Sequence, residues 1–473
     1  MTATDTTTPG DTSGTLGEVP LGPLDGRYRA VVAPLSEHLS EAALNRERLR
    51  VEVEWLVHLT ATGAVPGVRP LTDQEVARLR AAVAGFGPDD VAELARTERV
   101  TLHDVKAVEY YVKARMEGTS LADLTEIVHL FCTSEDVNNL AYALMIRGAV
   151  EQVWLPAARA FTGDVAELAR RHRALPMLAR THGQPATPTT LGKELAVAAH
   201  RLDRQLRRVE RAEYLGKING ATGTFSAHVA GAPDTDWIEV SRSFVEGLGL
   251  VWNPLTTQIE SHDWQAELYA DVARFNRILH NLCTDVWTYI SLGYFIQVSG
   301  LGTVGSSTMP HKVNPIRFEN AEANLEVSNA LFDVLGSTLV TSRLQRDLTD
   351  SSMQRNVGTA FGHSLLALDN ARRGLAGLDV DPATLAADLD ATWEVLGEAV
   401  QSVMRVHGLD RPYERLKELT RGRRIDAAAL QVFVGGLGLP ADVEARLLAL
   451  TPGGYIGVAD RLVDFLDGPG TGR

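Results

Sequence analysis

The stretch of sequence that decides the fold runs from Thr187 to Tyr214 and reads TPTTLGKELAVAAHRLDRQLRRVERAEY. Apolar side chains recur in it every three or four residues and form one stripe: Leu191, Leu195, Ala198, Leu202, Leu206 and Val209. Arginine and glutamate fill the opposite face, as is typical of a helix that packs against other helices. Thr187-Pro188 predicts the N-cap and first turn. The pattern indicates a helical bundle.

Other runs of the same kind extend the bundle. They lie from about Trp264 to Gln297 and from Pro315 to Leu339, and another begins at Ser134 and continues beyond Trp154. A helix of roughly 25 to 35 residues is about 40 to 50 Å long, which exceeds an ordinary globular helix. Several such helices are more than the core of one subunit needs. We therefore expect an all-α protein whose bundles associate into an oligomer.

Shorter helical patterns flank the long ones. On the N-terminal side they cover Ser36 to Thr62, Asp73 to Ala84 and a run that opens at Leu102, while Gly216 to Pro233 predicts a long loop or small hairpin. After Asp381 the predicted helices are Pro382–Val406, Pro412–Thr420, Asp426–Gly435, Pro440–Leu450 and Tyr455–Leu466. We predict a disordered tail over residues 1–20 and three helical domains: an N-terminal domain over 21–120, a central long-helix domain over 121–380 and a C-terminal domain over 381–473.

The composition argues against a membrane-spanning protein and against a nucleic-acid-binding protein. A chain of 473 residues with 45% hydrophobic content is too long for one core, and it lacks the apolar run of about 18 residues that a membrane helix needs. The formal charge of −14 argues against a nucleic-acid surface. Cys132 and Cys283 lie in apolar contexts that we expect to be helical, which favours a reducing compartment. Since Met1 to Pro20 has no secretory signal pattern, we expect a cytoplasmic protein.

The stretch from Gly302 to Pro315, GTVGSSTMPHKVNP, is the first candidate site. Its glycines and serines allow the backbone to move and to turn N–H groups toward an anion, as a closing lid must. Lys312 adds a positive charge, and Asn314 before Pro315 has the form of a helix N-cap. The alternative for the Gly-Ser-Ser portion is a flexible loop between two long helices.

Three further segments carry more polar residues than their positions need. They are TSEDVNN at 133–139, RTHGQPATP at 180–188 and SRLQRDLTDSSMQRN at 342–356. His182 lies in a predicted loop, where it either bonds a backbone carbonyl or, paired with a carboxylate such as Glu319, delivers a proton to a leaving nitrogen. Taken alone, the Leu24–Tyr28 segment reads as a surface turn and Asp104 as a helix-capping residue.

The lid stretch resembles the signature of the fumarase/aspartase superfamily of lyases, and Met309-Pro310-His311-Lys312 resembles its adenylosuccinate lyase branch. The likeness extends from about Leu24 to Leu466, and RPYERLKELTRG at 411–422 resembles the bacterial branch with a long C-terminal domain. This resemblance implies a homotetramer with one shared central bundle and active sites that are each built from three subunits. It also implies fumarate release from succinylated purine nucleotides, without a metal or organic cofactor.

The resemblance also assigns roles to residues. It implies that Ser306 is the base, that His182 is the acid and that Glu319 orients the histidine. Ser307, Lys312 and Asn314 would hold the succinyl carboxylates. The nucleotide and its phosphate would contact Arg27, Tyr28, His103, Asp104, Arg346, Ser351 and Arg355, and the pocket would be completed by Thr133, Ser134, Gln258, Asn320 and Ser352.

Two alternatives remain open at this point. Another lyase of the superfamily, of the argininosuccinate lyase or fumarase type, shares the lid, although His311 within Met-Pro-His-Lys argues against it. A non-catalytic bundle protein would retain the fold alone, and the presence of both Ser306 and His182 argues against that class. One departure from the branch is Leu102, because a polar residue commonly precedes His103-Asp104 there. A nucleotide contact is expected to be lost at that position.

Overall fold

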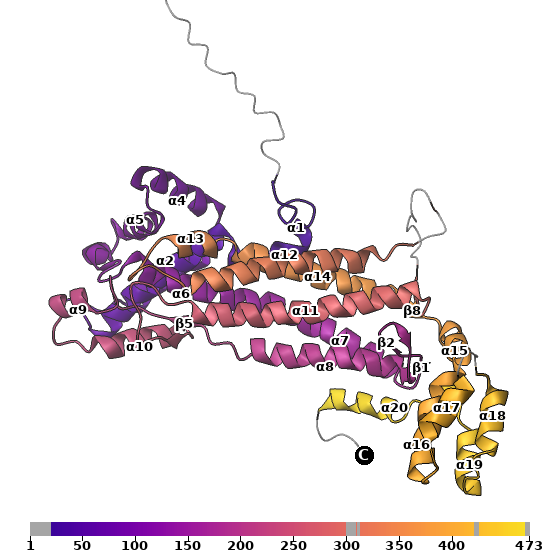
Figure 1. Cartoon of the computed structure of the whole chain (residues 1–473). Helices are drawn as coiled ribbons and strands as arrows, with labels where there is room; N and C mark the ends of the chain where they lie inside the picture. The colour runs from indigo at the N-terminus through magenta and orange to yellow at the C-terminus, as the bar shows by residue number, and fades with distance from the viewer. Residues whose placement is uncertain (1–19, 299–308, 310–312, 421–424, 469–473) are drawn as a thin grey trace, which may run out of the picture. The chain divides into compact units, whose positions relative to one another are not determined.

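The computed structural model of the chain describes residues 20–298, 309, 313–420 and 425–468, which belong to two compact units. The first unit takes the described parts of Met1–Trp154, Glu213–Tyr269 and Val327–Leu366, and the second takes those of Leu155–Ala212, Ala270–Glu326 and Ala367–Arg473. Three long helices contribute residues to both units (Figure 1): α11 (Asp263–Ser291), α12 (Ile316–Leu339) and α14 (Val357–Ala376).

Nearly all of the regular secondary structure described in the first unit is helical. Its described part contains one parallel pair of two-residue strands, β5 (Leu215–Gly216) and β6 (Val251–Trp252). The other elements are α1 (Arg29–Leu39), α2 (Glu41–Thr62), α3 (Asp73–Ala84), α4 (Pro88–Thr101), α5 (Asp104–Met116), the 3₁₀-helix η1 (Ala122–Ile127), α6 (Ser134–Ala149), the π-helical turn η2 (Val150–Trp154), α9 (Ser226–Gly231), α10 (Trp237–Gly247) and α13 (Thr349–Gln354).

The second unit is also helical, and its described residues include three short antiparallel strand pairs. They join β1 (Pro176–Met177) to β4 (Thr189–Thr190), β2 (Arg180–Thr181) to β3 (Gln184–Pro185), and β7 (Phe295–Gln297) to β8 (Leu378–Val380). Its other elements are α7 (Leu155–Arg171), α8 (Leu191–Val209), α15 (Pro382–Asp390), η3 (Trp393–Leu396), α16 (Gly397–Val406), α17 (Pro412–Thr420), α18 (Ala427–Gly435), α19 (Ala441–Leu448), η4 (Pro452–Gly454), α20 (Ala459–Leu462) and η5 (Val463–Asp467).

The cores follow the apolar stripes of the sequence. In the first unit, α2 and α5 bury Leu49, Val53, Leu56, Val108 and Val112 in one cluster. In the second unit, α7 packs along α8, whose predicted stripe is buried from end to end. Each leucine that is removed from water in this way contributes roughly 2 kcal/mol. The all-α prediction and the predicted seam of the deciding stretch are therefore confirmed.

Several predicted boundaries were wrong for local reasons. The Ser36–Thr62 helix is broken at Ser40, whose hydroxyl accepts the Ala43 N–H (3.1 Å) and caps α2. α8 begins later than expected because Thr189–Thr190 pairs with Pro176–Met177 as a strand; Thr190, not Thr187, caps the helix. α12 begins at Ile316 because the carbonyl of Pro315, rather than Asn314, accepts the first helical bonds.

Other regions differ in kind from the prediction. α4 was not expected at all. The region from Gly216 to Pro233 is not a hairpin, since Gly216 pairs with Trp252 and residues 226–231 form α9. The predicted helix Pro382–Val406 consists of α15, η3 and α16. Both cysteines are free, but Cys132 lies in the loop before α6 rather than in a helix.

The three-domain division at residues 120 and 380 stays a prediction. Within the described part of the chain, no helix is long and apolar enough to cross a bilayer.

Candidate active site

The N-terminus of α6 is held by a buried ion pair. Asp136 and Lys217 are both fully buried, and the Lys217 Nζ donates to the carboxylate at 2.8 Å. The same carboxylate accepts the backbone N–H groups of Thr133, Asn219 and Gly220 at 2.9 to 3.1 Å. Four donors thus satisfy this buried carboxylate, and the lysine among them neutralises its charge, as burial requires. The contact joins the start of α6 to the glycine-rich loop that follows β5.

That loop also supports the Gln258 segment. A Cβ at Gly223, which has φ +75°, would lie 2.4 Å from the Thr256 carbonyl oxygen, so only glycine fits there. The Gln258 side chain donates to the carbonyl of Ala221 at 2.8 Å. The start of α6, the loop at 217–223 and the Gln258 segment are therefore linked by specific contacts.

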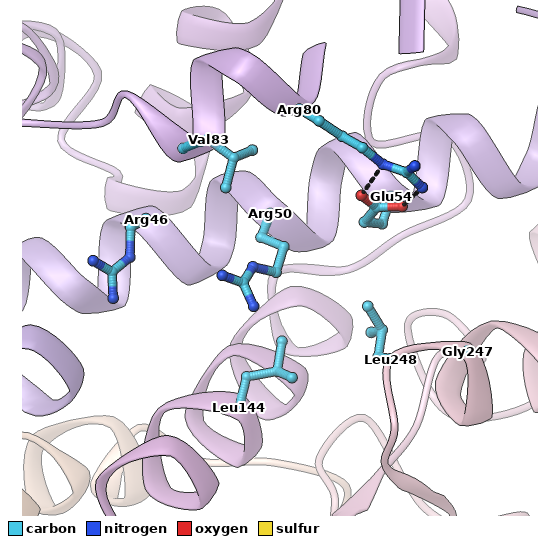
Figure 2. A pocket seen from close by; sticks show the side chains of 9 residues that line it. Arg46, Arg50, Glu54, Arg80, Val83, Leu144, Gly247 and Leu248 are labelled. Carbon is cyan, nitrogen blue, oxygen red and sulfur yellow. Dashed lines mark hydrogen bonds and ion pairs between the residues drawn. The ribbon is translucent and has the colours of Figure 1, made fainter. Parts of the chain in front are cut away.

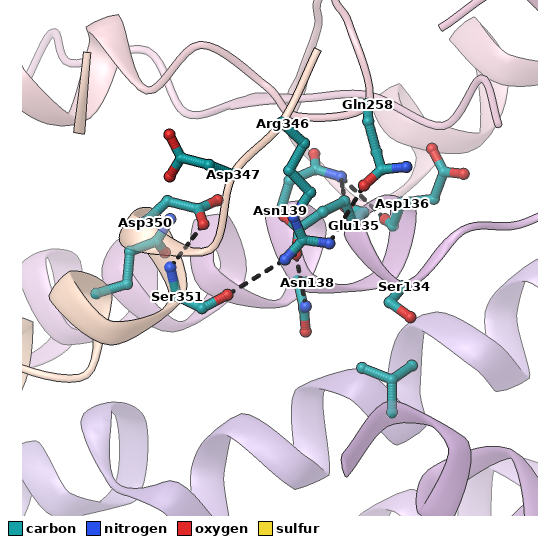
Figure 3. Close-up of polar contacts among 12 residues, drawn as sticks. Ser134, Glu135, Asp136, Asn138, Asn139, Gln258, Arg346, Asp347, Asp350 and Ser351 are labelled. Carbon is teal, nitrogen blue, oxygen red and sulfur yellow. Dashed lines mark hydrogen bonds and ion pairs between the residues drawn. The ribbon is translucent and has the colours of Figure 1, made fainter. Parts of the chain in front are cut away.

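Arg346 lies at the centre of the polar cluster in Figure 3. Its guanidinium contacts the Glu135 carboxylate at 2.9 Å, the Gln258 side-chain oxygen at 3.4 Å and the Ser351 hydroxyl at 3.3 Å. Three predicted substrate-binding residues are thereby brought together: Gln258, and Arg346 and Ser351, which follow it about 90 positions later in the sequence. Glu135 is buried; burial raises its pKa, although Arg346 and Asn138 oppose the shift.

A second group of charges surrounds Asp104. Its carboxylate pairs with the buried Arg48 at 2.7 Å and with Arg355 at 3.4 Å. Burial alone would raise the pKa of Asp104, but Arg48, the Val105 amide and Arg355 outweigh it and lower the pKa. Arg355 also pairs with Glu41 at the start of α2.

Other predicted residues of the first unit lie at or just before the start of a helix, or on the short helix α13. His103 caps α5 by accepting the Lys106 N–H at its Nδ1 (3.2 Å), and the Ser134 hydroxyl lies 3.5 Å from its Nε2. The Arg27 guanidinium lies 5.7 Å from the centre of the Tyr28 ring. Ser352 is exposed on α13, where its carbonyl accepts from Asn356.

The predicted proton donor lies in the second unit. His182 and Gly183, with φ +53° and +74°, form the two-residue turn between β2 and β3, and the histidine is exposed. A hairpin turn with both central residues left-handed is the type that closes two-residue connections. Glu319 accepts from the Trp287 indole N–H at 3.3 Å. No hydrogen bond or ion pair joins His182 to Glu319 within the described residues of this one chain.

The remaining predicted residues divide into two sets. Asn320 accepts from the Asn324 side chain at 3.1 Å, through its own side-chain oxygen, and Asn314 is half-buried before α12. Ser306, Ser307 and Lys312 lie outside the described residues. In the part of the chain that the structure describes, no group of three or more His, Cys, Asp and Glu side chains is arranged to hold a metal ion.

Sequence reasoning missed three charged residues of the first unit, Arg48, Lys217 and Glu41, and it gave no role to Glu135 within the TSEDVNN segment. Two of them carried a signal. Lys217 is a charge within the otherwise uncharged run LGKINGATGTF, and Arg48 falls on the apolar face of α2. A charge at a position that predicts burial needs a partner.

A separate hollow of about 590 Å³ is lined by Arg46, Arg50, Arg80 and Glu54 (Figure 2). Each arginine already has a carboxylate partner. Arg80 binds Glu54 at 2.7 Å, and Arg46 and Arg50 contact Glu47 at 3.3 and 3.2 Å. The arginines of this hollow are thus balanced by carboxylates, as Arg346 and Arg355 also are, and the hollow contains none of the predicted site residues.

A buried histidine lies beside the 217–223 loop. His228 is fully buried among the rings of Phe131, Phe225 and Trp237, and neither ring nitrogen has a hydrogen-bond partner. Burial lowers its pKa to about 4, with Asp136 opposing the shift and Lys217 adding to it. The folded state therefore holds this imidazole neutral.

This burial predicts acid sensitivity. Because the unfolded chain protonates His228 near pH 6.5 and the folded chain only near pH 4, stability is lost as the pH falls through that window, by about 2 kcal/mol between pH 7.5 and pH 5. His228→Phe should reduce the drop in Tm measured by calorimetry between these pH values. His407→Phe, at an exposed histidine, is the matched control. An unchanged drop in His228→Phe would contradict the assignment.

Comparison with known proteins places the chain in a family. The sequence profile of the family described as "Lyase" matches residues 26–328, and that described as "Adenylosuccinate lyase C-terminal" matches residues 342–456. Adenylosuccinate lyase of Escherichia coli strain K12 is 49% identical over 447 residues, covering 94% of this chain and 98% of that protein. The Haemophilus influenzae enzyme is 46% identical with the same coverage.

Solved structures share the fold. A fumarate lyase from Mesorhizobium sp. BNC1 has a TM-score of 0.74 at 21% identity, covering 92% of this chain and 97% of its own. The 3-carboxy-cis,cis-muconate lactonizing enzyme from Pseudomonas putida has a TM-score of 0.71 at 22% identity, covering 91% and 95%. The two family profiles and the extent of the identity show that this chain belongs to the adenylosuccinate lyase family.

Proposed function

We propose that the chain is a carbon–nitrogen lyase that eliminates fumarate from adenylosuccinate, giving AMP, and from the succinylated aminoimidazole carboxamide ribotide of purine biosynthesis. The observation that carries the proposal is 49% identity to a known adenylosuccinate lyase along nearly the whole length of both chains. The polar cluster around Arg346 supports it, because it combines a guanidinium, a hydroxyl and an amide, the donors that a nucleotide phosphate and base need.

The reaction begins at carbon. Ser306 removes a proton next to a carboxylate of the succinyl group, and the developing negative charge spreads into that carboxylate. A serine hydroxyl is a weak base, so Ser306 must act as the alkoxide, after its own proton has passed to the water that leaves as the lid closes. Lys312 and backbone N–H groups of the lid stabilise the anionic state, while Ser307 and Asn314 hold the succinyl carboxylates.

The C–N bond then breaks, and His182 protonates the departing nitrogen. The exposed place of His182 on a hairpin tip suits this role, because a proton donor must reach the substrate. Glu319 would orient the histidine. The proposed assembly is a homotetramer in the cytoplasm, in which three subunits contribute to each site and bring His182 and Glu319 to the lid of a neighbour.

The nucleotide would occupy the first unit's cluster. Arg346 and Arg355 would hold the phosphate with Ser351 and Ser352. The nucleotide would also contact Arg27, Tyr28, His103 and Asp104, while Thr133, Ser134 and Gln258 would complete the pocket.

The deciding experiment measures fumarate release by the purified full-length chain. Adenylosuccinate should be cleaved to fumarate and AMP, and argininosuccinate should not. Release of fumarate from argininosuccinate alone would instead indicate the related activity of the superfamily.

A further inference from the structure

Arg355 forms its closest ion pair with an exposed carboxylate, whereas the neighbouring Arg48 pairs with the half-buried Asp104. Its guanidinium pairs with Glu41 at the start of α2 and, more distantly, with Asp104 at 3.4 Å. Asp104 is already neutralised by Arg48, whose side chain is only 4% exposed and lies 2.7 Å away. The charge of Arg355 is therefore balanced chiefly by Glu41.

The two carboxylates are held very differently. Asp104 is anchored by Arg48 and by the Val105 N–H at 2.9 Å, and its side chain is 29% exposed. The Glu41 side chain is 67% exposed, and within the described residues Arg355 is its hydrogen-bonding partner. An exposed, singly held carboxylate on a flexible side chain is easily displaced by water or by another anion.

Space for another anion exists at Arg355. The arginine is 42% exposed and lines two hollows that share it. One hollow includes Ser40, Glu41 and Tyr142, and the other includes Asp25 of the Leu24–Tyr28 turn. A phosphate that enters either hollow would meet the Arg355 guanidinium, one of whose N–H groups donates to Glu41.

We propose that Glu41 competes with the nucleotide phosphate for Arg355 and thereby sets the affinity of the site for its substrate and product. The proposal rests on the proposed function, in which Arg355 contacts the phosphate. Glu41 is a specificity-determining residue in this sense: a ligand without a phosphate cannot displace it and gains nothing from Arg355. The competition also weakens retention of AMP and so favours product release.

The test uses AMP as the probe and titration calorimetry of the full-length protein at low ionic strength, where screening is weak. Glu41→Gln keeps the length and shape of the side chain but removes the competing charge. AMP should bind this variant about two- to fivefold more tightly than the wild type, the range expected from the strength of an exposed ion pair. Glu37→Gln, at an exposed glutamate that pairs with Arg46 instead, is the matched control and should leave AMP affinity unchanged.

A purely structural role for Glu41 predicts the opposite sign. If Glu41 only held Arg355 in place, Glu41→Gln would bind AMP more weakly, and that result would overturn the proposal, as would an unchanged affinity. Arg355→Gln should weaken AMP binding, and Glu41→Gln added to it should give no gain, because the competition needs the arginine. A gain in that background would also overturn the proposal.

Failure of the proposed function has a different signature. A wild-type protein that releases no fumarate from adenylosuccinate would reject the function itself. A wild type that releases fumarate and binds AMP, combined with no gain in Glu41→Gln, would reject only the competition.

Discussion

Replacement of Ser306 by alanine is expected to lower kcat for adenylosuccinate cleavage by about 10²- to 10⁴-fold, the usual contribution of a general base. The reason is that no other residue of the lid stretch is assigned to remove the carbon-bound proton. The oligomer measured by light scattering should be unchanged, because the substitution deletes one oxygen atom. Steady-state fumarate release by the purified variant is the measurement.

Thr303→Val serves as the control for this result. It removes a hydroxyl from the same stretch, at a residue with no assigned role, and should retain activity within a few-fold of the wild type. Near-normal turnover in Ser306→Ala would reject Ser306 as the base. An equal loss in both variants would point to a general requirement for lid hydroxyls instead.

Lys217→Met is expected to cause the largest loss of stability, roughly 3 to 5 kcal/mol, because it leaves the Asp136 carboxylate buried without a counter-charge. The Thr133, Asn219 and Gly220 N–H groups would remain, but neutral donors do not cancel the charge. Calorimetry at matched protein concentration should show a Tm several degrees below that of the wild type.

Lys106→Met is the matched control. Lys106 also pairs with a carboxylate at an N···O distance near 2.7 Å, that of Glu109, but its side chain is 43% exposed. Its loss should cost at most about 1 kcal/mol. Equal Tm values in the two variants would contradict the importance of burial at Lys217. The double variant Lys217→Met, Asp136→Leu should recover part of the stability, since no unpaired charge remains.

The sequence predicted the helical fold because helical periodicity is a local property. The stripe of α8 and the α3 helix, Asp73–Ala84, were readable from spacing alone. The break at Ser40 was not readable, because a serine hydroxyl either caps a helix or faces solvent within one. The late start of α8 depends on pairing between Met177 and Thr189, which spacing along one helix does not reveal.

The sequence predicted which residues belong to the candidate site, but not which of them contact one another. Family resemblance indicated Gln258, Arg346 and Ser351, but not that one guanidinium contacts both other side chains. The Asp136–Lys217 pair joins residues 81 positions apart, and no periodic pattern relates them. Burial supplies the missing argument, because a charge without solvent must find a partner wherever the chain places one.

The left-handed turn at His182-Gly183 has a consequence for the orientation of the proposed proton donor. Both residues of this turn have left-handed backbone conformations. The position of the imidazole therefore depends on the conformation of the neighbouring glycine. A Cβ at Gly183 would meet no atom within 4 Å, but its left-handed backbone is one that L residues rarely adopt, so a substitution there would strain the turn that carries the proposed proton donor. Substitutions at Gly183 are thus expected to change where the imidazole points, although the histidine itself is retained.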